Sequence, residues 1–402
     1  MKNILQKVDV ERLFNHIKSI EGVRHHLADP KQLNEAADYI LNEFQTYNLQ
    51  TNDQVFKVEG TDMDFRNIEA YLGDQSKPEV LVTSHYDTVR TTPGANDNAS
   101  AVAVMLEIAR ILSSEKFSGN VRFVSFTLEE LHPTVVNQSR DKGLELGIFD
   151  EDYKYTSYHT QKMIKQFYKT ASINISKGKS MLESWESSFE EIKEELTDSE
   201  MEFCKFVKEN RKKLTRTSWI GKVGLVGSDH WVKEAVASNK KIKGVLNLDT
   251  VGYTSSRKHS QILPPLMSPL FFPSYKVKSR KRIGNFISIA TDKNSKNLGK
   301  IFCKSCKHED INLPYMWGKI PLGFDKIAKW IRDILRSDHA PFWREGIPAL
   351  MLSDTANFRY PHYHTEADTI DKLNFDFIRK VAQATLATVI ELSKIYNLNI
   401  VK

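Results

Sequence analysis

The sequence predicts an α/β fold, a three-layer α/β/α sandwich around a mixed, mostly parallel sheet. Three observations support this prediction. Short apolar runs of Val, Ile, Leu and Phe recur along the chain, turn residues bound each run, and helical patterns separate several of them. Runs this continuously apolar are typical of strands that helices cover on both faces. We therefore expect right-handed crossovers between the parallel strands.

The elements follow this alternation in order. Residues 8–48 are predicted to form two amphipathic helices, because apolar side chains recur there every three or four positions. The predicted strands are Asn67–Leu72, Val80–Ser84, Val121–Thr127, Gly244–Leu248, Phe286–Ala290 and Pro348–Ser353. The predicted helices between and after them are 99–113, 229–238, 295–306, 323–335 and 374–396.

One stretch, residues 131–222, breaks the alternation. It is rich in charge, has no convincing strand, and carries apolar side chains at helical spacing. Ser180 with Glu183, and Thr197 with Glu200, have the spacing of capping boxes, so two helices should join near Thr197. We predict an inserted helical subdomain here. It is either a lid or dimer contact, through which the chain could form a homo-oligomer, or a decoration that packs its own small core.

Length and composition narrow the function. Residues 1–402 are expected to form a single catalytic domain that contains the insertion, and 40% hydrophobic with 27% charged residues is ordinary for a soluble globular protein. A net charge of +6 is too small for the basic stripe of a nucleic-acid binder, so no nucleic-acid partner is expected. No apolar run of about 18 residues predicts a membrane span, and the first residues lack the apolar core of a secretory signal. Three cysteines provide no disulfide framework, which favours a reducing cytoplasm.

Acidic and histidine side chains stand where the predicted strands end. His85 and Asp87 follow the second strand and leave the same face of extended chain, so Asp87 is placed to hold the second ring nitrogen of His85. Asp97 lies directly before a helix. Because Asn98 or Ser100 can cap that helix, the carboxylate of Asp97 is available for another role.

Three further positions repeat this placement. Glu129 and Glu130 end the third strand, where adjacent carboxylates are costly unless cations compensate them. Asp249 follows the fourth strand, and His364 lies between a strand and the final helix. In sheets of this class, active sites collect at the carboxyl ends of strands. The sequence therefore predicts two divalent metal ions about 3.5–4 Å apart that share a carboxylate, and a hydrolase rather than a binding module.

The segments around these residues resemble the co-catalytic zinc aminopeptidases, whose fold is shared with glutamate carboxypeptidase II and the glutaminyl cyclases. The resemblance covers most of residues 10–395 outside the insertion. The matching strings, in the family's order, are VLVTSHYDTV, GANDNASAVAVMLEIAR, VRFVSFTLEE, NLDTVGY, SDHAPFWREGIPALML and YHTEADTIDKLN.

The resemblance implies two Zn²⁺ per chain. His85, Asp97 and Asp249 would hold one ion. Asp97, as the bridge, would hold the second together with Glu130 and His364. Two zinc ions bring +4 against −3 from these carboxylates, and a hydroxide would bring the centre to zero.

It also implies roles for neighbouring residues. Glu129 would be the general base, and Tyr363 could hydrogen-bond the tetrahedral oxyanion. Asp338 and His339 match a segment close to the site or the substrate pocket. Family members often have a cis peptide after the bridging aspartate, which here is Asp97–Asn98.

The activity implied is that of a zinc-dependent exopeptidase, first of all an aminopeptidase that hydrolyses N-terminal residues of peptides. A carboxypeptidase or amidohydrolase on the same scaffold is an alternative, and a glutaminyl cyclase is another. Cyclases, however, resemble the bridging segment with Ser where this chain has Asn98. A receptor-like relative without activity would have lost ligands that are all present here. The chain departs from the family pattern in two respects. Gly227-Ser228 comes only after the insertion, where relatives place a Gly-Ser segment soon after the glutamate pair, and Ala101 stands where a glycine is common.

Overall fold

The central feature of the fold is an eight-stranded sheet in the order β1-β2-β4-β3-β5-β8-β6-β7. The structure is a computed structural model and describes residues 2–115, 117, 119–176, 179, 181–212, 219–262 and 282–397. Strands β4, β3, β5 and β8 run parallel in the centre. The pairs β1–β2, β2–β4 and β6–β8 are antiparallel, and β6 and β7 are parallel to each other. The strands are β1 Gln50–Lys57, β2 Asp64–Leu72, β3 Glu79–His85, β4 Val121–Phe126, β5 Ile242–Leu248, β6 Ile287–Thr291, β7 Tyr315–Lys319 and β8 Ala349–Ser353.

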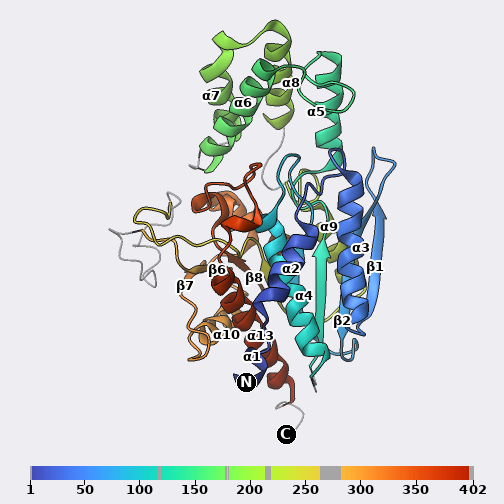
Figure 1. The fold of residues 1–402 in the computed structure, drawn as a ribbon, viewed down its shortest axis with the longest axis vertical. Helices are drawn as coiled ribbons and strands as arrows, with labels where there is room; N and C mark the ends of the chain where they lie inside the picture. The colour runs from blue at the N-terminus through green and yellow to red at the C-terminus, as the bar shows by residue number, and fades with distance from the viewer. Residues whose placement is uncertain are drawn as a thin grey trace.

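Helices cover both faces of this sheet, which confirms the predicted three-layer fold (Figure 1). Along β3, Val80 and Val82 face one apolar core and Leu81 faces the other, as the period of a strand requires. The first core is closed by α1 Lys2–Leu5, α2 Val10–Ile20, α3 Pro30–Thr46, α4 Ser100–Ser113, α10 Lys296–Cys306 and α13 Phe375–Asn397. The second is closed by α9 Val226–Ala237, α11 Phe324–Trp330 and α12 His339–Arg344.

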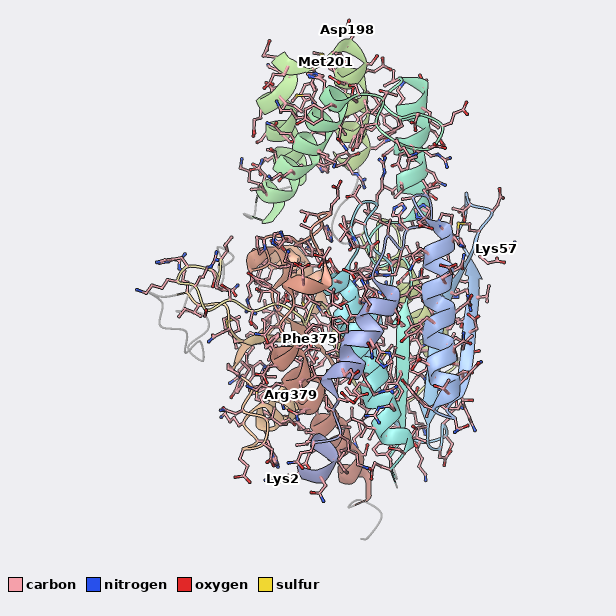
Figure 2. The ribbon with its side chains drawn as sticks, viewed as in Figure 1. Lys2, Lys57, Asp198, Met201, Phe375 and Arg379 are labelled. Carbon is pink, nitrogen blue, oxygen red and sulfur yellow. The ribbon has the colours of Figure 1, made fainter. Side chains whose placement is uncertain are left out.

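Local sequence explains where these helices begin. Asp9 and Asp29 precede α2 and α3, and each side chain accepts a hydrogen bond from a backbone N–H of the first turn. Helix α4 is apolar almost all round, because it lies between the sheet, α2 and α13 and is buried at nearly every position. Figure 2 shows Phe375 and Arg379 along α13, on the same side of the sheet.

All six predicted strands are present, but two strands were missed. β1 reads QTNDQVFK and buries little besides Phe56, so it carries no apolar run. β7 has five residues. Both are edge strands, which pair with one neighbour only and need less apolar surface than central strands. The predicted helix 323–335 is also wrong in part, because Ile331 leaves helical geometry and the chain continues as the 3-10 turn Arg332–Leu335.

The predicted insertion forms a lobe of helices beyond one end of the sheet (Figure 1). The lobe has its own apolar core, centred on residues such as Phe167, Trp185 and Phe203. Thr197 and Glu200 form the expected capping box, with reciprocal hydrogen bonds of 2.9 and 3.3 Å, whereas Ser180 lies outside the described residues. Asp198 and Met201 lie at the end of the lobe far from the sheet (Figure 2). The helices are α5 Pro133–Glu145, α6 Tyr158–Ser176, α7 Met181–Ile192 and α8 Asp198–Lys212.

Candidate metal centre

Parallel strands bring the candidate ligands to one edge of the sheet. His85 is the last residue of β3, the glutamate pair follows β4, and Asp249 directly follows β5. Since these three strands are parallel neighbours, their carboxyl ends meet. Asp97 arrives from the segment before α4, and His364 from the loop before α13. The structure thus brings together all five residues that were expected to be metal ligands.

Asp97 stands between two histidines. Its Oδ1 lies 3.3 Å from Nε2 of His85, and its Oδ2 lies 3.1 Å from Nε2 of His364. Glu130 approaches the second histidine, with Oε1 3.0 Å from Nε2, and Asp249 approaches the first, with Oδ1 at 3.9 Å. The side chains form two groups, each with its ligand atoms within 4.8 Å of one another, and Asp97 belongs to both.

These groups fit divalent cations. His85 and Asp97 are only 1% and 2% exposed, yet Nε2 of each histidine and Oδ2 of Asp97 are buried without a hydrogen-bond partner in the described structure. Buried polar atoms nearly always have such a partner. Imidazole nitrogens and carboxylate oxygens are also the ligands that zinc accepts in catalytic sites. A pair of cations would therefore satisfy the atoms that the protein itself leaves without partners.

The protonation of the metal-free centre shows how strongly the carboxylates act on one another. Burial lowers the pKa of His364, but Glu130 and Asp97 outweigh it and raise that pKa to about 10. The pKa of His85 is likewise held well above its usual value, by Glu129 and the aspartates against the effect of burial. Burial together with Glu130 and Asp249 raises the pKa of Glu129, although His85 opposes this. The buried carboxylates thus favour positive charge at both histidines.

Asp87 supports both glutamates. Its two carboxylate oxygens accept hydrogen bonds from the backbone N–H groups of Glu129, at 3.1 Å, and Glu130, at 3.2 Å. Asp87 does contact His85, but the shorter contact is made by its backbone carbonyl rather than by the predicted carboxylate. Nδ1 of the ring lies 3.2 Å from the backbone carbonyl of Asp87, and the carboxylate is farther away at 3.5 Å.

Two supporting residues escaped the sequence analysis. Asp368 accepts hydrogen bonds from the backbone N–H groups of Asn96 and Asp97 and from the hydroxyl of Tyr360. Arg24, which is fully buried, donates to backbone carbonyls on both sides of the β3–α4 loop, among them those of Tyr86 and Gly94. Neither residue lies at a strand end; Asp368 stands inside the family-like string YHTEADTIDKLN, whereas no motif includes Arg24.

The backbone around Asp97 follows the family resemblance. The Asp97–Asn98 peptide is cis, as expected, and the Asp249–Thr250 peptide is cis as well. Gly94, just before this segment, has φ +65°, and a Cβ there would lie 2.4 Å from the carbonyl oxygen of Asp97. Glycine is therefore required at this approach.

Tyr363 and Asp338 lie near the centre, whereas His339 packs against Trp343. The ring of Tyr363 stacks on His364 at 3.8 Å between centroids, and its hydroxyl accepts a hydrogen bond from Arg336 at 3.4 Å. Asp338 and His339 are fully buried. Burial raises the pKa of Asp338 to about 7, although His85 opposes the shift, and burial lowers the pKa of His339 to about 3.

Comparison with known proteins agrees with this geometry. The model of Peptidase family M28 matches residues 67–297 and 323–389. The uncharacterized protein YfbL of Escherichia coli is 23% identical over 366 residues, which is 88% of this chain and 79% of YfbL. Aminopeptidase YwaD of Bacillus subtilis is 54% identical, but only over 52 residues, which is 13% of this chain and 11% of YwaD.

Two solved structures share the fold. The LapA aminopeptidase of Legionella pneumophila superposes with a TM-score of 0.58 at 16% identity and covers 98% of this chain and 74% of its own. A glutaminyl cyclase of Porphyromonas gingivalis gives 0.53 at 14% identity and covers 96% and 99%. None of the described helices is both long and apolar enough to cross a bilayer.

Proposed function

Because this chain belongs to peptidase family M28, we propose that its metal centre binds two zinc ions and that it acts as an aminopeptidase on peptides. Family membership makes the chain a metallopeptidase. The number and identity of the ions and the side chains that hold them are the proposal. It is supported chiefly by the placement of Asp97, whose two oxygens face separate histidine–carboxylate groups.

The proposed division of the ligands follows the two groups of side chains and is the one that the family resemblance implies. His85, Asp97 and Asp249 would hold one ion, and Asp97, Glu130 and His364 the other. A bound zinc pair polarises a peptide carbonyl and lowers the pKa of water from 15.7 toward about 7.

Glu129 is placed to move the proton. Its Oε2 lies 3.9 Å from Nε2 of His85, and it belongs to neither ligand group. Burial and the neighbouring carboxylates raise its pKa, which suits a residue that accepts a proton and then passes it to the leaving amine. Asp87 fixes the backbone of Glu129, and Tyr363 offers a hydroxyl beside His364 for the developing oxyanion.

A substrate panel tests the proposal. Purified, zinc-loaded protein is assayed on aminoacyl-anilides, N-acyl amino acids, dipeptides blocked at the N-terminus, and peptides that begin with glutamine. We expect release of free amino acids from anilides and from peptides with an open N-terminus, and no activity on blocked dipeptides. Hydrolysis of the blocked dipeptides alone would indicate the carboxypeptidase alternative, and hydrolysis of N-acyl amino acids would indicate an amidohydrolase.

The cyclase alternative is favoured by one observation, the shared fold with the cyclase of Porphyromonas gingivalis. Pyroglutamate formation from glutamine peptides, with one zinc per chain, would support it. The proposal extends to the compartment, because Cys204, Cys303 and Cys306 are all buried and free, which suits a reducing environment.

A further inference from the structure

The outer face of α6 forms an open groove that polar side chains share with the apolar side chains of Tyr158 and Ile173, and the metal centre does not explain it. Among the described residues, its lining comes from positions of α6 that recur every three or four residues and from one residue of α7, and the cavity measures about 680 Å³. The opposite face of α6, with Ile164 and Phe167, is buried in the core of the lobe. The polar residues of the groove are Gln161, Lys162, Lys165, Gln166, Lys169 and Glu191.

The groove borders the loop that carries a candidate ligand. Nζ of Lys165 lies 3.1 Å from Oε1 of Glu366, and Glu366 is two residues after His364. Neighbouring turns of α6 present Lys162 and Lys169 on the same face as Lys165, so the groove runs along the face of α6 that contacts the loop carrying His364.

Residues at both ends of the insertion are hydrogen-bonded next to Glu129, the candidate base. The backbone N–H of Leu225 donates to the carbonyl of Glu129 at 2.8 Å, and that of His132 donates to Val223 at 2.5 Å. Both ends of the insertion are therefore tied next to Glu129, while α6 contacts the His364 loop. The lobe approaches the centre from two sides.

The charge of the groove indicates what it binds. Lys165 is paired with Glu366, and Glu191 is hydrogen-bonded by Thr170, but Lys162 and Lys169 form no ion pair with any described residue. Seven residues of helix span about 10 Å, which matches about three residues of an extended peptide. The adjacent helix α7 carries four glutamates and no basic residue, which disfavours a long polyanion such as nucleic acid beside the groove.

We propose that this face of α6 binds carboxylates of the peptide substrate downstream of the scissile bond, and so selects short acidic peptides. The proposal rests on the peptidase function proposed above. The carboxylate can be the C-terminus of a short peptide or the side chain of an acidic residue, and the two sources share the same chemistry. Lys162 and Lys169 are the specificity residues, and the two glutamines supply further donors.

Kinetics on matched peptides provide the first test. Tetrapeptides share their first two residues, end in Glu-Glu or Gln-Gln, and have free or amidated C-termini. At low salt, we expect kcat/KM of the acidic free acid to exceed that of the neutral amide about tenfold, and the ratio to shrink toward 1 in 1 M salt. In the Lys162→Gln/Lys169→Gln variant the ratio should approach 1, while aminoacyl-anilide turnover stays unchanged.

The matched control is Lys205→Gln, which removes an exposed lysine of α8 outside the groove and should keep the wild-type ratio. The free-acid and amide pair reports the C-terminal carboxylate, and the Glu and Gln pair reports side chains. A wild-type ratio near 1, or a double variant that keeps the full ratio, would overturn the inference.

A binding experiment separates this inference from the peptidase function. Fluorescein-labelled acidic and neutral tetrapeptides are titrated into Glu129→Gln protein with and without the two lysine substitutions, with anisotropy as the readout. We expect about tenfold tighter binding of the acidic peptide, lost in the triple variant. Failure of the wild type to cleave any peptide or anilide would end the proposed function alone, whereas equal binding of both peptides would end the groove inference alone.

Discussion

Ionisable side chains are abundant both at the edge of the sheet formed by β3, β4 and β5 and in the helical lobe α5–α8. The two regions differ in how these side chains are buried and paired. In the lobe most charged side chains lie at the surface, several of them in pairs such as Lys142 with Glu202, and the core is largely apolar. At the sheet edge, acids and histidines are buried and retain atoms without partners. The lobe therefore has an apolar core of its own, whereas the sheet edge concentrates buried charges that bound cations would compensate.

The largest expected effect separates base from ligand at the sheet edge. Glu129→Gln should lower kcat by at least about 10³-fold, because it removes the proton acceptor, yet leave the zinc content unchanged. His364→Ala should lose both the rate and metal. Metal content by elemental analysis and anilide turnover are measured together, with Glu202→Gln on the lobe as the control. Near-normal turnover in Glu129→Gln would show that the base is another residue.

Metal removal should destabilise mainly the sheet edge. A cation at 100 times its Kd stabilises the folded state by about 2.7 kcal/mol, so chelation should lower the melting temperature by several degrees. Re-addition of zinc should restore it. Limited proteolysis should show that cleavage within 131–222 is not increased by the chelator at 25 °C. A melting temperature that changes with neither treatment would contradict the claim that bound cations stabilise the fold.

A core substitution in the lobe should show the reverse pattern. Phe203 is fully buried and packs edge-to-face on Phe149, so Phe203→Ala should destabilise the lobe by about 3–5 kcal/mol. We expect faster proteolytic cleavage within 131–222 and an unchanged zinc content. The control is Tyr158→Ala, since Tyr158 is 82% exposed. Loss of zinc in the Phe203 variant would show that the two regions are coupled.

A smaller effect concerns pH. The pKa of His364 in the metal-free protein is raised from 6.5 to about 10, so its stabilising charge is complete below pH 6.5 and is lost as the pH rises toward 10. The melting temperature of chelated protein should therefore fall between pH 7 and pH 10 more steeply than that of chelated His364→Gln. Parallel slopes would mean that His364 is not protonated among these carboxylates.

The two regions also differ in how well the sequence revealed them. Central strands and the residues at their ends could be predicted, because buried parallel strands are continuously apolar and their carboxyl ends meet. The edge strand β1 could not, since an edge strand needs no apolar run. The roles of Asp368 and Arg24 could not be predicted, because both hold backbone groups that are distant in sequence. The lobe was recognised as helical from its periodicity, but its contact through Lys165 with Glu366 depends on tertiary placement.

The central claim is that two cations share Asp97, and a crystal structure of zinc-loaded protein with anomalous scattering at the zinc edge tests it directly. We predict two peaks about 3.5–4 Å apart, one between His85 and Asp249 and the other between Glu130 and His364, with Asp97 bound to both. A single peak, or two peaks that Asp97 does not bridge, would contradict the account.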